Sequence, residues 1–159
     1  FGHPVPRVAG KLQETGRAAA ARIVKTEFTD KADTLVLDIR SAYAVKELKK
    51  LERTFVFSRE GAGSLTVTDE VEFTAPQTFG TALITFSKWR QVSAGRLLVG
   101  EGRDALRVDL SADKAKLRIA SAEIKEDLPG GLIPIRLGIE LAEPVTAATV
   151  RMTVTPAEK

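Results

Sequence analysis

The stretch LERTFVFSREGAGSLTVTDEV, residues 51–71, predicts an antiparallel β-hairpin and decides the fold class. Apolar and polar residues alternate on both sides of Gly61-Ala62-Gly63, as expected for half-buried strands joined by a glycine-rich turn. Centring the hairpin on Gly61 places the following residues opposite each other: Leu51 and Val71, Arg53 and Asp69, Phe55 and Val67, and Phe57 and Leu65. One face of the predicted hairpin is therefore largely apolar and carries one pair of opposite charges.

Arg53 and Asp69 are expected to point inward as a cross-strand pair. A buried guanidinium needs a partner, and a carboxylate can accept its two parallel N–H donors. We interpret the pair as a structural ion pair, because each charge explains the presence of the other. The alternative is that Arg53 and Asp69 are site residues at the edge of a cleft.

The rest of the chain repeats the two-residue alternation and predicts an all-β fold, an antiparallel, supersandwich-like β-sandwich. The alternating segments begin near Leu35, Leu106, Ile133 and Ala148, and turn signals separate them at residues 75–77, 100–102, 129–131 and 143–144. A single helical turn is expected within Ala44 to Leu51. We expect one domain, residues 1–159, in which Phe1 to about Thr15 form an extended arm.

Composition excludes several classes of function. The 159 residues contain no cysteine and one histidine, which excludes thiolate and histidine-cluster metal sites, so neither a metal nor another cofactor is predicted. The net charge of +3 comes from scattered Lys and Arg residues without interleaved aromatic residues, so we expect no nucleic-acid partner. No apolar run approaches the roughly 20 residues of a membrane helix, so no membrane partner is expected.

An ordered set of short motifs resembles a known family. His3 is followed by Gly10 and Gln13, with the spacing of the H-N-T-x-x-x-x-G-x-x-Q pattern that opens the β-sandwich of heparinase II/III-like polysaccharide lyases, which include oligoalginate lyases. The matching segments continue with Gly16 and the small-residue strand Ala18–Ala21, Asp38-Ile39 before Ala42-Tyr43, Leu51–Phe55, and Leu65–Asp69. Together they cover about the first 90 residues in the family's order.

The resemblance implies that this chain is the C-terminal β-sandwich of a larger enzyme. Such an enzyme also has an N-terminal α/α toroid that carries most catalytic residues, and it cuts uronic-acid polysaccharides by β-elimination. The chain is then a fragment that lacks the helical domain and is inactive alone, and its parent acts on an acidic polysaccharide. The resemblance also implies a periplasmic or secreted protein.

The family motif assigns candidate site residues. By match, His3 would neutralise the substrate carboxylate or transfer a proton, Gln13 would contact substrate or brace the loop, and Gly10 would allow a tight backbone turn. Tyr43 lies about where relatives place a substrate-contacting tyrosine. Two departures are clear: Pro4-Val5 replaces the family's Asn-Thr, and Val5 stands where some members have a zinc-binding histidine.

Alternative interpretations remain open. His3 could be an arm residue without a role, and Tyr43 could be a tyrosine at the edge of the core with its hydroxyl in water. The domain could also be a non-catalytic module that binds glycan or docks another domain, although Trp89 is the only tryptophan and is expected to be packed. An independent β-sandwich enzyme lacks support, because no G-x-S-x-G motif is present. The polysaccharide and the oligomeric state are left open.

Overall fold

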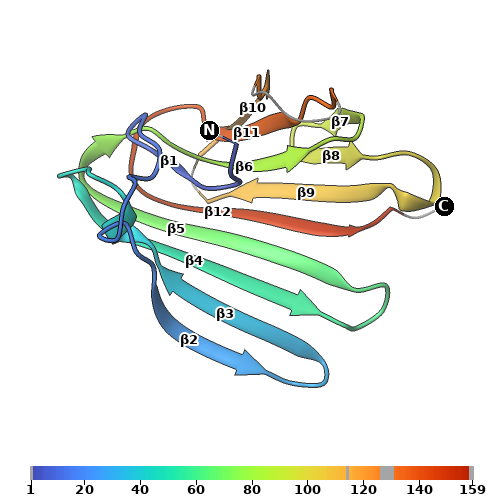
Figure 1. Cartoon of the computed structure of the whole chain (residues 1–159), viewed down its shortest axis with the longest axis horizontal. Helices are drawn as coiled ribbons and strands as arrows, with labels where there is room; N and C mark the ends of the chain where they lie inside the picture. The colour runs from blue at the N-terminus through green and yellow to red at the C-terminus, as the bar shows by residue number, and fades with distance from the viewer. Residues whose placement is uncertain (1, 114, 126–130, 158–159) are drawn as a thin grey trace.

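The computed structural model describes residues 2–113, 115–125 and 131–157, which form two antiparallel β-sheets (Figure 1). An eight-stranded sheet has the order β2-β3-β4-β5-β12-β9-β8-β7, and a four-stranded sheet has the order β1-β6-β11-β10. The strands are β1 (Arg7–Val8), β2 (Arg22–Phe28), β3 (Ala32–Asp38), β4 (Leu48–Ser58), β5 (Ser64–Gln77), β6 (Phe79–Thr85), β7 (Trp89–Ser93), β8 (Arg96–Val99), β9 (Leu106–Ala112), β10 (Leu117–Glu123), β11 (Ile135–Leu141) and β12 (Val145–Pro156). Two 3-10 turns, η1 (Arg40–Ala42) and η2 (Gly102–Asp104), connect strands. The predicted all-β sandwich is confirmed.

The β4–β5 hairpin has the register that the sequence predicts. Leu51 lies opposite Val71, Arg53 opposite Asp69, and Phe55 opposite Val67. Burial alternates over residues 51–53 of β4 and residues 67–73 of β5, because successive side chains of a strand point to opposite faces of the sheet. The hairpin lies near the middle of the larger sheet, with β3 beside β4 and β12 beside β5.

The core lies between the two sheets. Its fully buried side chains come from both layers: Leu51, Val71, Leu97, Val108 and Val150 from the larger sheet, and Val8, Leu137 and Ile139 from the smaller one. Burying such aliphatic side chains is the dominant favourable contribution to folding. Trp89 is partly buried and packs against this core, so it is not displayed on a flat surface.

The smaller sheet covers only part of the larger one. All seven residues of β2 are exposed, and none of the seven residues of β3 is fully buried. In Figure 1, β2, β3 and the β4–β5 hairpin extend away from β6 and β11. Among the residues that the structure describes, none therefore forms a covering layer over this part of the inner face of the larger sheet.

Two local predictions are wrong. The segment Ala44 to Leu51 forms no helical turn: β4 begins at Leu48, and the 3-10 turn comes earlier, at Arg40–Ala42. A register shift between Leu48 and Lys50 breaks the apolar alternation there, and the Lys50 amine pairs across the strands with Glu70 at 2.7 Å. Because the two-residue alternation is interrupted at this register shift, the lysine and glutamate residues around it resemble the pattern of a helical turn.

The expected strand Ala18–Ala21 is also absent. The chain turns there after Gly16, whose φ of +97° favours glycine, and the Ala19 amide donates to the Gly16 carbonyl. Strand β2 begins only at Arg22. Most of the predicted turn at residues 129–131 lies outside the described residues, which resume at Gly131.

Gly80 should be required for the close approach of β6 and β11. A methyl group at Gly80 would lie 2.9 Å from the Ile139 carbonyl oxygen and 3.0 Å from the Glu140 Cα, both backbone atoms. We expect Gly80→Ala to lower the free energy of unfolding by about 1–3 kcal/mol. Gly138→Ala is the matched control, because its methyl group would meet nothing closer than 3.5 Å. Equal stability of the two variants in urea unfolding would contradict this packing.

Candidate functional site: the N-terminal arm and its support

The N-terminal arm is fixed along the edge of the smaller sheet. Strand β1, Arg7–Val8, pairs with Gly80 and Phe79 of β6, and a tight turn then brings Val8 and Lys11 opposite each other. The two central residues of that turn, Ala9 and Gly10, have φ of +49° and +74°, the left-handed conformation of a type I′ turn. Residues 7–11 of the predicted arm are therefore held against the smaller sheet.

Three buried side chains bind the carbonyl groups of residues 3–6. The Arg136 guanidinium donates to the carbonyl oxygens of His3 at 2.8 Å and Val5 at 3.3 Å. Arg53 donates to the Pro4 carbonyl at 2.8 Å, and the Tyr43 hydroxyl donates to the Pro6 carbonyl at 2.8 Å. We call Tyr43, Arg53 and Arg136 the arm clamp. The first and third of these carbonyl groups thus accept hydrogen bonds from Arg136, and the second and fourth accept them from Arg53 and Tyr43.

Arg53 is the best-connected member of the arm clamp. Its Nε donates to Asp69 Oδ1 at 2.6 Å and its Nη2 to Asp69 Oδ2 at 2.7 Å, which is a bidentate pair. Nη2 also donates to the Thr81 hydroxyl of β6 at 2.7 Å. Arg53 and Asp69 are 6% and 1% exposed, respectively, so the pair is shielded from water. One side chain of the larger sheet therefore joins β5, the smaller sheet and the arm.

Tyr43 is buried beneath the arm, so the alternative in which its hydroxyl lies in water is wrong. Burial raises the pKa of Tyr43 well above its usual range, and the nearby Arg53 charge and a hydrogen bond with the Gln13 side chain offset part of this shift. Gln13 and Tyr43, both predicted as substrate contacts, are thus brought together. Their substrate role stays a prediction.

The sequence gives no indication of a role for Arg136. It lies on β11, out of phase with the apolar residues Leu137 and Ile139. It is only 5% exposed, and burial lowers the pKa of Arg136, with the Arg7 charge adding to the shift. Pairing of the strands places three small residues beside it, Gly80, Ala120 and Gly138, which leave room for a long side chain and are far apart in the sequence.

The His3 side chain is exposed, while its backbone carbonyl is held by Arg136. Among the hydrogen bonds of the described residues, none joins the His3 imidazole to Gln13 or Tyr43. No group of three or more His, Cys, Asp and Glu residues in the described part of the chain is arranged to hold a metal ion. No helix in that part is long and apolar enough to cross a membrane. The arrangement can present one histidine at a fixed position.

A basic hollow lies beside the arm. Two adjoining shallow hollows of about 310 and 170 Å³ on the smaller sheet share Arg7, Gly80 and Glu140, and they also include Arg118 and Arg136. Arg118 pairs with Glu140 at 2.6 Å and is otherwise exposed. Three arginines and one glutamate line the two hollows, so their positive charge favours the binding of an anionic group beside the arm.

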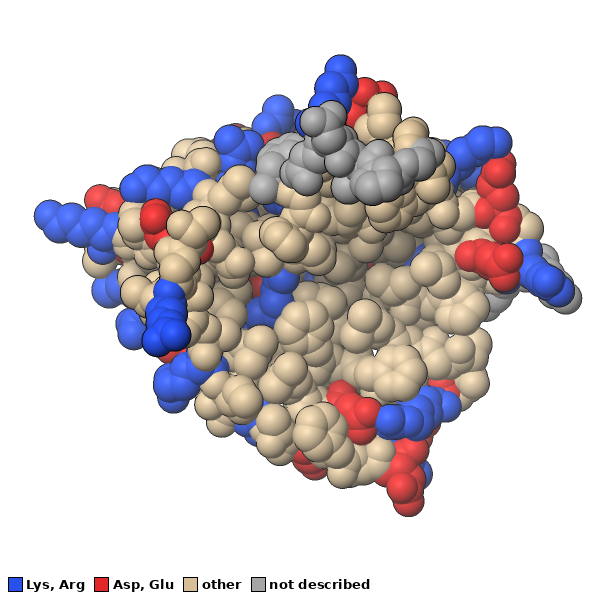
Figure 2. All heavy atoms as spheres, viewed as in Figure 1, with Lys and Arg blue, Asp and Glu red and all other residues tan. Residues whose placement is uncertain are grey.

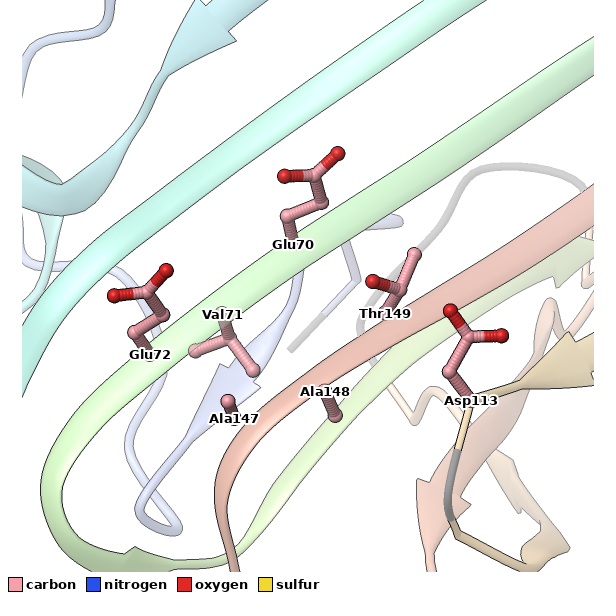
Figure 3. Close-up of a pocket in the computed structure, with 7 residues that line it drawn as sticks. All are labelled: Glu70, Val71, Glu72, Asp113, Ala147, Ala148 and Thr149. Carbon is pink, nitrogen blue, oxygen red and sulfur yellow. The ribbon is translucent and has the colours of Figure 1, made fainter.

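A further hollow of about 160 Å³, between β5 and β12, has the opposite charge (Figure 3). Glu70 and Glu72 come from β5, and Asp113 follows β9. Its carboxylates repel acidic sugars, and none of the candidate residues His3, Gln13 and Tyr43 lines it. We therefore place the candidate site at the arm.

Removing the Asp69 carboxylate should leave the buried Arg53 guanidinium without its anionic partner. We expect Asp69→Ala to lower the free energy of unfolding by about 3–5 kcal/mol, because Arg53 keeps its charge and loses its partner. The same variant should speed amide exchange in residues 3–8, since Arg53 also holds the Pro4 carbonyl. Glu101→Ala, which breaks an exposed ion pair with Lys88, should change little. Equal effects of the two variants would refute a buried structural pair.

The only tyrosine of the chain allows a direct titration. Because burial raises the pKa of Tyr43, the folded state favours the neutral phenol, and this stabilisation is present below the unfolded value of about 10. It is lost as the pH rises toward the folded value. We expect the ultraviolet absorbance of the phenolate to show no ionisation near pH 10 in the folded chain and ordinary ionisation in urea. A midpoint near 10 in the folded chain would contradict the burial of the hydroxyl.

Comparisons with known proteins identify the fold. No protein-family model matches the sequence, and no curated protein matches it. The structure is similar to heparan sulfate lyase HepC from Pedobacter heparinus, with a TM-score of 0.75 and 15% sequence identity, covering 99% of this chain and 24% of that chain. It is also similar to the heparinase III BT4657 gene product, with a TM-score of 0.76, 13% identity and the same coverage.

These likenesses establish the fold, and the chain spans about a quarter of the length of both proteins. The resemblance to heparinase-like lyases that the motifs predicted is thus confirmed at the level of the fold.

Proposed function

We propose that this chain is the β-sandwich domain of a polysaccharide lyase that cleaves uronic-acid polymers by β-elimination, and that it is inactive alone. The observation that carries the proposal is the structural match of nearly the whole chain to one quarter of two lyases, heparan sulfate lyase HepC and a heparinase III. The arm clamp supports it, because buried charged groups hold the backbone beside an exposed histidine at the edge of the smaller sheet.

The proposed role of His3 is to stabilise negative charge on the substrate carboxylate. In β-elimination a base removes the proton beside that carboxylate, and charge accumulates on it in the transition state. An imidazole can donate a hydrogen bond or a proton in the physiological pH range. Because residues 3–6 are held at four carbonyl groups, the imidazole starts from a restricted position and loses less freedom on binding.

The remaining catalytic groups belong to another part of the proposed parent. Proton exchange with the sugar needs a phenol or comparable group that reaches it. The only tyrosine here, Tyr43, is buried and donates to Pro6, and burial keeps its phenol protonated. We propose that a second, helical domain supplies that group. A periplasmic or secreted location is part of the same proposal.

A non-catalytic module that binds acidic glycan is the alternative. The basic hollow beside the arm favours it, because Arg7 and Arg118 lie at its edge and can meet an anionic sugar. A binding module would retain the glycan without cleaving it, so the two functions separate in one set of measurements.

The test compares the 159-residue chain with the longer parent chain on heparin, heparan sulfate and alginate, following the absorbance of unsaturated uronate products. We expect no cleavage by the 159-residue chain and cleavage by the parent. His3→Ala in the parent should lower kcat by roughly 10²-fold or more, the usual effect of losing one transition-state donor.

Lys88→Ala is the control, because Lys88 is highly exposed and lies outside the arm. Full activity of the His3→Ala parent would remove His3 from the mechanism. Cleavage by the 159-residue chain would overturn the two-domain proposal, and binding without cleavage by the parent would favour the glycan-binding module.

A further inference from the structure

The uncovered part of the larger sheet carries large apolar side chains on its inner face. We call this set the apolar face: Ile23, Phe28, Leu35, Phe55, Phe57 and Leu65. Residues directly opposite each other in antiparallel strands share a face, and the register places Leu35 opposite Phe55, and Phe57 opposite Leu65. Ile23 is opposite Leu37, and Phe28 is opposite Asp33, which in turn faces Phe57. Phe55 is two residues from the buried Arg53, so the set continues the inner face that forms the core.

This face is exposed to solvent in the 159-residue chain. Phe28 is 71% exposed, Ile23 64%, Phe57 46% and Leu65 37%. Figure 2 shows a broad uncharged area in the same view as Figure 1, with charged side chains mostly at its periphery. Contiguous apolar surface larger than roughly a few hundred Å² is rare on monomeric soluble proteins and marks an interaction site.

The chemistry of the face favours a protein as its partner. Phenylalanine and isoleucine side chains offer no donors to the carboxylates or hydroxyls of an acidic sugar, so a polysaccharide would lose its hydration there without compensation. Pairing of a second copy along the edge of β2 is opposed by the irregularity between Ile23 and Lys25 and by the charged side chains Lys25 and Glu27.

The place of the face in the molecule points to a domain of the same polypeptide. Phe55 contacts the arm clamp, since the Arg53 guanidinium carbon lies 5.9 Å from the centre of its ring, and Arg53 holds Pro4. Polypeptide joined to the arm would therefore be tethered beside the face at a high effective concentration. In both similar lyases this fold occupies only 24% of the chain, so it is joined there to about three times as much polypeptide.

We propose that the apolar face docks against another domain of the same polypeptide. This depends on the proposed function only for the identity of that domain. An interface between domains of one chain typically buries about 600–1,500 Å² and is more polar than an obligate interface, so it can include the neighbouring arm.

The experiment measures amide hydrogen exchange of residues 22–37 and 53–66 in the 159-residue chain and in the longer parent chain. We expect slower exchange in the parent, and we expect Ile23→Asp to abolish that difference, because it places a charge inside the interface. Val92→Asp is the matched control: Val92 is a β-branched residue, 48% exposed, on β7 at the opposite edge of the same sheet. It should leave the difference intact.

Several outcomes overturn the proposal. These are equal exchange in both chains, protection by added heparin in the 159-residue chain, or a dimer of that chain that Ile23→Asp dissociates. Lyase activity is measured separately. A parent that shows docking without cleavage would therefore refute the proposed function alone, and one that cleaves without docking would refute this inference alone.

Discussion

The bidentate pair between Arg53 and Asp69 is the interaction on which the rest of the structure depends. It lies at the centre of the larger sheet, almost without exposure to water, and the guanidinium has donors left over after binding the carboxylate. Those donors reach the Thr81 hydroxyl in the smaller sheet and the Pro4 carbonyl in the arm. A buried ion pair rarely adds much net stability compared with apolar packing, since both charges must leave water. Its contribution here is a directional set of hydrogen bonds that joins β4, β5, the smaller sheet and the arm.

The arm illustrates how a segment without regular structure can be positioned. Residues 3–6 contain two prolines, Pro4 and Pro6, which provide no backbone N–H donor, so this segment cannot extend the β1–β6 ladder as an ordinary strand would. The carbonyl groups of residues 3–6 remain as acceptors, and they bind Arg53 and Arg136 from the two sheets and Tyr43 from the loop before β4. The prolines also restrict the backbone, so less conformational entropy is lost when the arm is ordered. An exposed histidine is thereby joined to a rigid backbone.

The two layers of the sandwich have different extents, and this difference separates the interior from the surface available to a partner. Where the smaller sheet covers the larger one, the alternating residues form an ordinary dry core. Beyond it, β3 and β2 extend the larger sheet without a second layer from the described residues, so the side chains of β3 are only partly buried and those of β2 are exposed. The arm lies at this boundary. The candidate site and the apolar face therefore meet at Arg53 and Phe55.

The sequence by itself determined the all-β class, the β4–β5 hairpin and its register. Alternation has a period of two residues, and a glycine-rich turn leaves one register that keeps the apolar residues on one face. It also indicated the Arg53–Asp69 pair, because both charges fall on that face, and the order of short motifs pointed to the lyase fold. Only the tertiary structure decided what these charges do beyond pairing, since the carbonyls of the arm and the Thr81 hydroxyl are distant in sequence. For the same reason Arg136 gave no signal: its role depends on a contact across more than 130 residues. The extent of the smaller sheet likewise decided whether an apolar strand residue is buried or exposed. The local sequence pattern contains no information about that extent.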